Sequence, residues 1–426
     1  MLPHVLCNDL ANEALRHLDK CYKEIYYNLA DPGFLESLQA LIKAVLHPQL
    51  SVLDLTWDWM FVTELVIDLV ESLRNLKILK FKRNMLVSYE ANLDKCTLSV
   101  TPDLHSLKCL QEMSVLFCCD DAILEMCSEC CKSLKVLDVR GSQRVTDKSI
   151  AHILKLDMLE ELKLSGTSIS VNGYLRLQRS LVNEGRTKTL KSFDFDCFSS
   201  TQLSYVREFS SLKDISLVVR TYYALVSDYL DNVLMLKIKC GGFEVVKDIL
   251  ISKGKQLLKL VLDLDFNESV DLKFIAENCT SLQSLTVIAD TCISELKDEL
   301  MFDTITSLNL QTRNSAAVEY LVSRCRNLTS LTLCSGLEFY KHSLERIFLR
   351  NSMDALEDIA IGSNTDNLSA ETLRFVTVHC KNLKSFEIFG SSYDETEKLC
   401  TLFPGVKISS KWQMPKLQVH FRKRYL

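Results

Sequence analysis

Large apolar residues recur along the chain in the spacing L-x-x-L-x-L, with other apolar residues standing in for some leucines. Successive segments begin 21 to 34 residues apart, and the period is near 25. A single match to such a loose pattern arises easily by chance, whereas a regular series does not. The pattern therefore indicates a chain of about 14 similar structural units. The units begin at Leu50, Leu76, Leu110, Leu134, Leu159, Leu190, Leu212, Val233, Leu257, Leu282, Ile305, Leu328, Leu356 and Leu383.

Each unit combines two apolar periods. In the last one, alternating apolar residues over 383–389 predict a short strand, and the apolar spacing over 370–380 predicts a helix before it. One such unit cannot bury its own apolar side, so neighbouring units must stack on one another. The sequence therefore predicts an α/β leucine-rich-repeat solenoid. We expect a curved horseshoe with parallel strands on the concave face, helices outside, and a short α-helical N-terminal cap.

The two ends of the chain differ from the repeats. Residues 1–46 contain two amphipathic segments, and Asp31 and Pro32 suit the N-cap and first turn of the second helix. This region is predicted to be a helical cap over the apolar end of the first repeat. Residues 47–409 form the predicted solenoid. Residues 410–426 alternate apolar and polar positions before a basic tip, which predicts a closing strand.

Composition narrows the class of protein. The chain has 50 basic and 55 acidic residues and a net charge of -5, which disfavours binding to nucleic acid or to an anionic membrane. The sequence predicts neither a signal peptide nor a membrane-spanning segment, because it shows no basic start followed by an apolar run and no apolar run of about 18 residues. The cysteine count of 17 is odd and the chain is long, so reduced thiols in the cytoplasm and/or nucleus are expected.

Four cysteines occupy the same position, three residues before the first leucine of a unit. They could form a metal site, a redox centre or a structural wall. Because they recur one or more units apart along the stack, we interpret them as structural. The cluster around Cys127 and Cys130 could hold zinc only if four ligands converged, so neither a metal nor a cofactor is predicted. The four repeat cysteines are Cys131, Cys279, Cys325 and Cys380.

No catalytic motif was found. None of the eight histidines forms a recognisable pair with a cysteine or a carboxylate, and the phosphate-binding and nucleophile motifs are absent. Asp194 and Asp196 could act as an acid–base pair, but their spacing is more typical of an acidic stripe on a strand. The sequence therefore predicts that the chain is not an enzyme.

Two longer segments carry a family resemblance. Residues 368–390 resemble the cysteine-containing subtype of leucine-rich repeat, with Cys380 at the helix end. Residues 137–154 are similar to the same subtype, with Val145-Thr146-Asp147 at the start of the helix. This subtype is common in substrate receptors of cullin-RING ubiquitin ligases, especially F-box proteins. The resemblance implies a protein-recognition subunit that binds an unknown substrate protein, a Skp1-type or elongin adaptor, and a cullin.

Residues 1–46 would carry the adaptor-binding helices of such a receptor. Their opening resembles an F-box, although the usual Cys-x-x-Trp is missing, and it matches an elongin-binding box only in part. Two interpretations stay open: a cap that also binds an adaptor, or a cap alone. Helices that fold onto the first repeat would favour the second. The candidate adaptor-binding residues are Leu2, Pro3, Leu6, Cys7 and Leu10.

Side chains at positions two, four and six after the first apolar residue of each unit are predicted to point into the concave face. They form basic, acidic, basic and neutral patches in turn, which suits a protein or peptide partner. For each residue, plain solvation is the alternative. The candidate partner-binding residues are Lys80, Lys82, Asp194, Asp196, Asp214, Lys237, Lys239, Thr286, Asn309, Gln311 and Thr332.

Trp57 and Trp59 follow the first predicted strand, at the edge of the concave face. Tryptophan is enriched at the centres of protein interfaces, so the pair is a candidate hot spot. Packing against the N-terminal helices is the competing interpretation.

The alternative to a ligase subunit is a free-standing leucine-rich-repeat scaffold or inhibitor that wraps one partner.

Overall fold

The computed structural model consists of two compact units, Met1–Leu212 (unit 1) and Lys213–Leu426 (unit 2). None of the helices in the described ranges is both long enough and apolar enough to cross a membrane. The structure describes residues 4–26, 32–56, 66–67, 69–82, 104–219, 230–264, 268–289, 291–293, 302–312, 314–335, 340–350, 353–362, 370–389, 400–401, 403 and 405–411.

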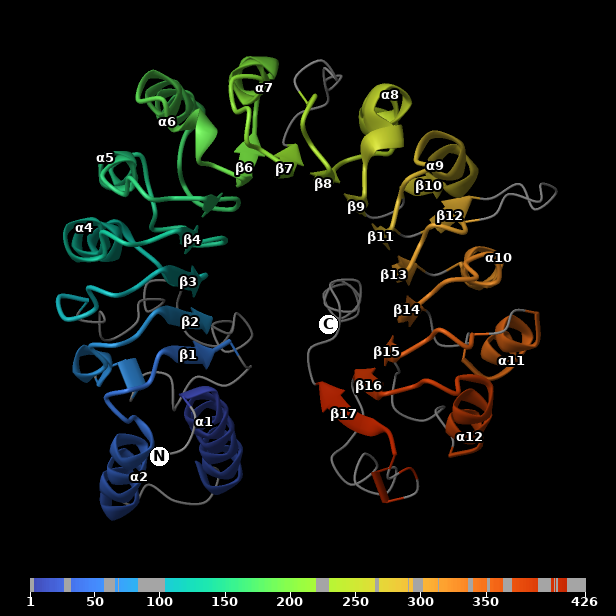
Figure 1. The fold of residues 1–426 in the computed structure, drawn as a ribbon, viewed down its shortest axis with the longest axis horizontal. Coiled ribbons are helices and arrows are strands. Elements are labelled where there is room, and N and C mark those ends of the chain that lie inside the picture. Colours follow the sequence, from blue (N-terminus) through green and yellow to red (C-terminus); the bar gives the residue numbers. More distant parts are fainter. Residues whose placement is uncertain are drawn as a thin grey trace. The chain divides into compact units, whose positions relative to one another are not determined.

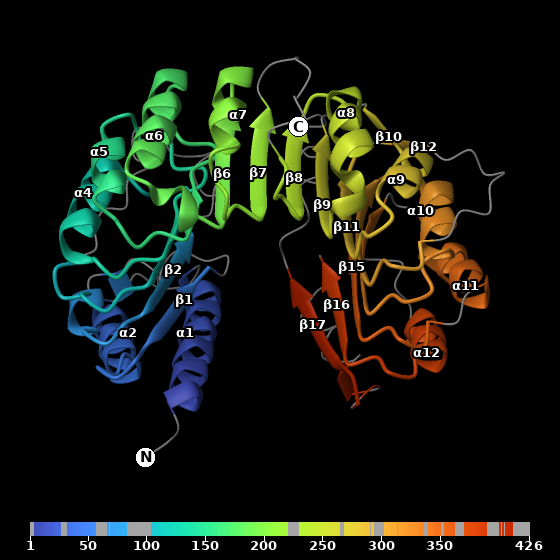
Figure 2. The ribbon, with the colours of Figure 1, turned by 45° about the horizontal axis from the view of Figure 1, so that its top comes forward.

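Unit 1 is a parallel sheet whose strands follow one another in chain order, each paired with the next. Helices of the repeats lie along one side of this sheet, and two N-terminal helices lie beside its first strand (Figures 1 and 2). The strands are β1 (Val52–Leu55), β2 (Ile78–Lys82), β3 (Glu112–Leu116), β4 (Val136–Asp138), β5 (Glu161–Lys163) and β6 (Ser192–Cys197). The helices are α1 (His4–Tyr26), α2 (Pro32–Val45), α4 (Asp121–Cys130), α5 (Ser149–Leu154), α6 (Val171–Asn183) and α7 (Ser200–Val206), with 3-10 turns η1 (Val70–Ser72) and η4 (Arg186–Lys188).

Unit 2 repeats the same arrangement with a longer parallel sheet. Its helices lie on one side of the strands, as Figure 1 shows. The strands are β7 (Asp214–Val219), β8 (Met235–Cys240), β9 (Lys259–Leu264), β11 (Ser284–Ile288), β13 (Ser307–Thr312), β14 (Ser330–Ser335), β15 (Asp358–Gly362), β16 (Ser385–Phe389) and β17 (Lys407–Lys411), with a small separate pair β10 (Ser269–Asp271) and β12 (Thr291–Ile293). The helices are α8 (Glu244–Lys253), α9 (Leu272–Asn278), α10 (Ser315–Val322), α11 (Tyr340–Arg350) and α12 (Ala370–His379), with the 3-10 turn η6 (Gly254–Gln256).

The repeat pattern locates the strands accurately. In each of the 14 repeats found in the sequence, the strand begins two residues after the first apolar residue, from Val52 after Leu50 to Ser385 after Leu383. The register keeps these positions aligned, because Ser284, Ser307 and their equivalents pair across neighbouring strands. The predicted α/β leucine-rich-repeat fold is confirmed.

The apolar pattern of the sequence did not predict the final strand, β17. The register aligns Lys407 with Ser385, which puts Gly405 and Ser410 where the pattern requires leucine and leaves only Ile408 apolar. Glycine and serine at these positions hide the repeat from an apolar search. The predicted closing strand was placed within 410–426, and the part of that range beyond Lys411 lies outside the described residues.

Alternation along the strands divides buried from accessible side chains. In β2, Leu79 and Phe81 are 0% and 1% exposed, whereas Ile78 and Lys80, at the alternate positions, are half-buried. Each fully buried leucine stabilises the fold by about 1.5–3 kcal/mol, so the stacked apolar rows supply a continuous core in each unit. The opposite side of each sheet, away from the repeat helices, presents the alternate positions. We call this surface the strand face of its unit.

Candidate functional site

The N-terminal helix α1 is folded onto the first strand of unit 1. The side-chain oxygen of Asn8 accepts hydrogen bonds from the backbone N–H of Ser51 (3.0 Å) and Val52 (3.3 Å). One turn later, Asn12 donates to the carbonyl of Val52 (3.1 Å) and accepts from the N–H of Asp54 (2.9 Å). The two amides thus serve as the missing neighbour strand of β1, and unpaired edge groups are satisfied in this way. This arrangement favours the interpretation of α1 as a cap.

Three leucines of the N-terminal helices are exposed among polar residues. Leu6 and Leu10, one turn apart on α1, are 46% and 58% exposed, and Leu41 on α2 is 53% exposed. Cys7 is half-buried. Leu2 and Pro3, the other candidate adaptor-binding residues, lie outside the described residues, as do Trp57 and Trp59.

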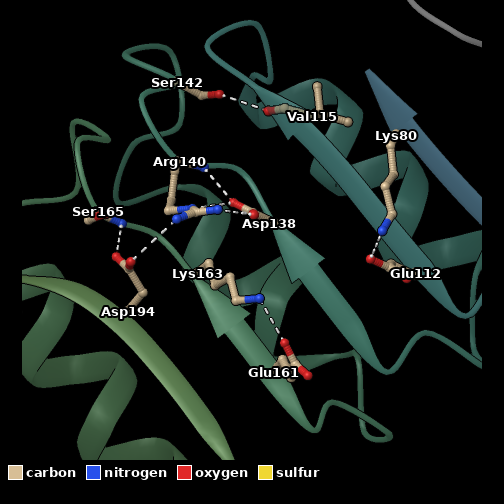
Figure 3. A network of polar contacts seen from close by, with 10 residues as sticks. All are labelled: Lys80, Glu112, Val115, Asp138, Arg140, Ser142, Glu161, Lys163, Ser165 and Asp194. Atoms are coloured by element: carbon tan, nitrogen blue, oxygen red, sulfur yellow. Dashed lines mark hydrogen bonds and ion pairs between the residues drawn. The ribbon is translucent and has the colours of Figure 1, made fainter. Parts of the chain in front are cut away.

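The strand face of unit 1 is lined by charged groups that pair with one another (Figure 3). Lys80 on β2 pairs with Glu112 on β3, with 2.6 Å between Nζ and Oε1. On β5, the Nζ of Lys163 lies 2.7 Å from Oε2 of Glu161. Lys82, also a candidate residue, is half-buried at the end of β2. The basic spot expected around Lys80 is therefore largely neutralised by an acidic neighbour.

The most connected part of this network surrounds Arg140, which follows β4. Its guanidinium makes a two-point contact with Asp138, at 2.9 Å and 2.7 Å, and lies 3.9 Å from Asp194. Asp194 also accepts a hydrogen bond from the backbone N–H of Ser165 at 3.2 Å. Figure 3 shows these groups converging from three neighbouring repeats. Paired, planar contacts of this kind fix side-chain geometry.

The expected open acidic patch at Asp194 and Asp196 is not found. The two residues are 3% and 2% exposed, because the chain after β5 passes beside them and donates its backbone N–H groups. Gly166, which donates to Asp196 at 3.2 Å, has a φ of 75°, a conformation that glycine adopts without strain. Alternation placed these side chains on the correct side of the strand but could not foresee the loop that covers them.

The strand face of unit 2 begins with charged residues of both signs. Asp214 on β7, and Lys237 and Lys239 on β8, are all half-buried. In the register, Lys239 lies opposite Asp263 of β9. These positions agree with the alternation on which the sequence prediction rested. Their role in binding a partner stays a prediction.

Further along, the strand face of unit 2 becomes neutral. Asn309 on β13 lies between Thr286 of β11 and Thr332 of β14, and all three are half-buried. Gln311, two residues further along β13, is 7% exposed, and so is less open than the sequence suggested. The amide oxygens of Asn309 and Gln311 are buried and accept no hydrogen bond from any residue described. Sequence alone gave no sign of this, because whether a side-chain oxygen has a hydrogen-bond donor depends on the residues that lie near it in the folded chain.

The four repeat cysteines lie where a helix ends and the chain turns toward a strand. All are buried, and Cys131 and Cys279 are the C-caps of α4 and α9. The carbonyl of Cys380 accepts from the N–H of Leu383 at 3.2 Å, and Cys131 makes the same bond to Leu134 at 3.1 Å. Burial raises the pKa of the Cys279 and Cys380 thiols to about 12, which keeps them neutral and unreactive at physiological pH.

In the cluster around Cys127 and Cys130, Cys119 and Cys127 are buried, whereas Cys130 is half-buried. Burial raises the pKa of Cys119 well above its usual range, and a hydrogen bond with Cys131, together with burial, raises that of Cys127. Among the residues described, no group of three or more histidine, cysteine, aspartate or glutamate side chains could hold a metal ion.

Comparison with known proteins gives distant structural likenesses. No family model matches the chain. No curated protein matches it significantly. One similar solved structure is the crystal structure of the yeast Rad7 and Elc1 complex, at 14% identity and a TM-score of 0.45, covering 95% of this chain and 93% of the other. Another is a leucine-rich-repeat protein of Leptospira interrogans, at 15% identity and a TM-score of 0.32, covering 87% and 98%. The fold assignment rests on the strand order and register given above.

Proposed function

We propose that this chain is a non-enzymatic protein-recognition subunit that binds a partner protein on its strand faces. The observation that carries this proposal is the alternation of the strands: one set of side chains is locked in the core, and the other is presented in aligned rows. A surface on rigid strands needs little ordering when a partner binds, which favours affinity. Charged and neutral zones along it supply specificity.

The finer proposal is that the chain is the substrate receptor of a cullin-RING ubiquitin ligase, acting in the cytoplasm and/or nucleus. Support comes from the resemblance of the repeats to that class of receptor and from Leu6 and Leu10, which leave an apolar stripe on the outer side of α1. An adaptor helix could bury this stripe. The receptor would act by proximity, since a bound substrate has its lysines at high effective concentration near a ubiquitin-loaded enzyme.

A second candidate function is a free-standing scaffold or inhibitor. It is favoured by Asn8 and Asn12, whose hydrogen bonds to β1 give α1 a sufficient structural role as a cap. The two functions share the strand faces and differ only in whether the outer side of α1 is occupied.

Point variants of α1 separate these functions better than a deletion, because removal of residues 1–46 would also uncover β1. The tagged full-length chain and its Leu6→Asp/Leu10→Asp variant should be isolated from cells and probed for Skp1-type adaptors, elongins and cullins. The matched control is Ile251→Asp, which alters an apolar residue of α8 that is 59% exposed.

The ligase proposal predicts an adaptor with the wild-type chain and the control, and its loss from the double variant while another partner is retained. Absence of every adaptor from the wild-type chain would overturn the ligase proposal in favour of the scaffold. Wild-type circular dichroism and melting temperature for the double variant would show that α1 is still folded.

A further inference from the structure

Two buried hydrogen-bond acceptors on β13 have no donor among the residues that the structure describes. Asn309 and Gln311 are two residues apart on the same strand, so their side chains project from the same side. The side-chain oxygen of each is buried, and neither is paired with a group in the described ranges. A buried acceptor without a donor destabilises a fold, and native structures contain few of them. Two on one strand therefore point to a donor from beyond the described residues, which a partner chain could supply.

The surroundings of these amides are uncharged. Asn309 lies between Thr286 and Thr332 in the register, and Gln311 lies between Ile288 and Cys334. Burial raises the pKa of the Cys334 thiol to about 12, so it carries no charge at neutral pH. A charged partner group placed on these two amides would lose its hydration and would meet no charged side chain at the register positions directly beside them.

The next strand, β15, carries small side chains beside this zone. Ala360 and Gly362 of β15 lie opposite Thr332 and Cys334. A Cβ added at Gly362 would lie 3.1 Å from the Sγ of Cys334, so even an alanine would crowd the thiol. Small side chains at these positions let the backbone of another chain approach closely. We define the neutral band as Thr286, Ile288, Asn309, Gln311, Thr332, Cys334, Ala360 and Gly362.

The spacing of the two amides matches an extended chain. Residues two apart on a strand are separated by about 6.6 Å, which is also the repeat of backbone N–H groups on one side of an extended peptide. Asn309 is half-exposed, and its terminal torsion is broad and two-fold, so its oxygen can turn toward an arriving donor. One peptide strand could thus donate to both oxygens.

We propose that the neutral band binds an uncharged, extended segment of a partner protein, whose backbone N–H groups donate to the side-chain oxygens of Asn309 and Gln311. This inference rests on the proposed function and assigns part of the recognition to β13. The contact contains no ion pair, so the affinity of the segment changes little with salt. The paired charges of unit 1 take no part in it.

The test uses a displayed library of random, unstructured peptides selected on the full-length chain. Counter-selection against the Asn309→Val/Gln311→Leu variant enriches peptides that need the two amides. Calorimetry then measures each peptide on the wild-type chain, on that variant, and on the control Glu161→Ala/Lys163→Ala, which alters the strand face of unit 1. Melting temperatures establish that every variant is folded.

We expect the Asn309→Val/Gln311→Leu variant to weaken binding by about tenfold or more, and the control to change it by less than about twofold. N-methylation of the peptide at single positions should reproduce the loss at two amides that are two residues apart. Affinity should be similar at low and high salt.

Three results would overturn the inference. They are failure to enrich any peptide, equal binding to the wild-type chain and the Asn309→Val/Gln311→Leu variant, and a loss on N-methylation that follows no two-residue spacing. Peptides that depend on Lys80 or Lys237 instead would refute the inference but leave the proposed strand-face function standing. Peptides insensitive to every strand-face variant would count against both.

Discussion

The strands β6 and β13 carry polar side chains at the same two repeat positions, yet the two pairs are in different states. On β6, Asp194 and Asp196 are buried beneath the chain that follows β5, and each accepts a backbone N–H from it. On β13, the amide oxygens of Asn309 and Gln311 are buried with no donor among the residues described. Equivalent positions thus accept hydrogen bonds within the fold in unit 1, whereas in unit 2 the two amide oxygens accept none from the residues described.

The difference shows that side-chain type alone does not tell which polar groups already have a hydrogen-bond or ion-pair partner within the fold. The charged residues of unit 1 look suited to binding, but they are already paired with one another. The neutral residues of unit 2 are less conspicuous, and the side-chain oxygens of two of them have no hydrogen-bond donor among the residues described. A partner gains most where the free protein is least satisfied.

The largest effect is expected from removal of Asp194. Asp194→Ala takes away the acceptor of the Ser165 N–H and one carboxylate near Arg140. We expect the free energy of unfolding to fall by about 2–3 kcal/mol, measured by urea denaturation. The matched variant is Asn309→Ala, at the same repeat position in unit 2, which should change stability by less than about 0.5 kcal/mol. Equal losses would remove the distinction between the two strands.

A second variant tests whether a hydrogen-bonded carboxylate also stabilises the side of unit 1 that carries the helices. Asp121 accepts hydrogen bonds from the backbone N–H and hydroxyl of Thr146, at 2.9 Å and 2.7 Å. Burial alone would raise the pKa of Asp121, but the hydrogen bonds from Ser149 and Thr146 outweigh it and lower the pKa below its usual 3.8. Asp121→Asn should cost about 1 kcal/mol at pH 7, because the site is partly open to solvent.

The pH dependence of this loss follows from the lowered pKa. The stability that Asp121 contributes is complete above the pKa of the unfolded chain and disappears as the pH falls through the lower folded value. The difference in melting temperature between wild type and Asp121→Asn should therefore shrink below pH 3.8. Asp157→Asn, at an exposed position, is measured alongside as the control. A difference that is constant with pH would contradict the assignment.

On β13 the expected change has the opposite sign. Asn309→Val removes an unpaired acceptor and adds a residue that favours strands, so the free protein should gain about 0.5–1 kcal/mol. Thr332→Val, the neighbour in the register, adds similar apolar area without removing an unpaired oxygen and should gain less. Thermal unfolding of the three chains measures this. A loss of stability in Asn309→Val would mean that its amide is already satisfied.

The smallest effect is expected from the partly exposed ion pairs of unit 1. Lys163→Ala breaks the pair with Glu161 and should change the free energy of unfolding by less than about 0.5 kcal/mol. The effect should vanish at high salt. A larger, salt-resistant loss would show that this pair is part of the structural network around Arg140.

Much of the fold follows from the sequence, because a repeat needs apolar residues at fixed positions to stack. The strand starts from Val52 to Ser385 lie where the apolar spacing predicts them. The pattern failed at β17, where Gly405 and Ser410 replace leucines. Pattern recognition therefore weakens at the end of a stack, where fewer neighbours have to be packed.

The candidate site was predictable in outline only. Alternation assigned Lys80, Lys237, Thr286 and Asn309 to one side of their strands, and the structure agrees on their half-buried positions. It could not show that Glu112 neutralises Lys80, since that contact joins residues far apart in the chain. Likewise, nothing in the pattern marked Asn8 and Asn12 as partners of β1.

The sequence by itself determined the repeat, the strand positions and the buried cysteine at the end of a helix, because these depend on local spacing of apolar side chains. Only the tertiary structure decided which polar groups are satisfied. Asp194 and Asn309 occupy the same repeat position, but a donor reaches one and not the other within the described chain. Hydrogen bonding depends on which segments far apart in the sequence come into contact, and that is fixed only when the repeats are stacked.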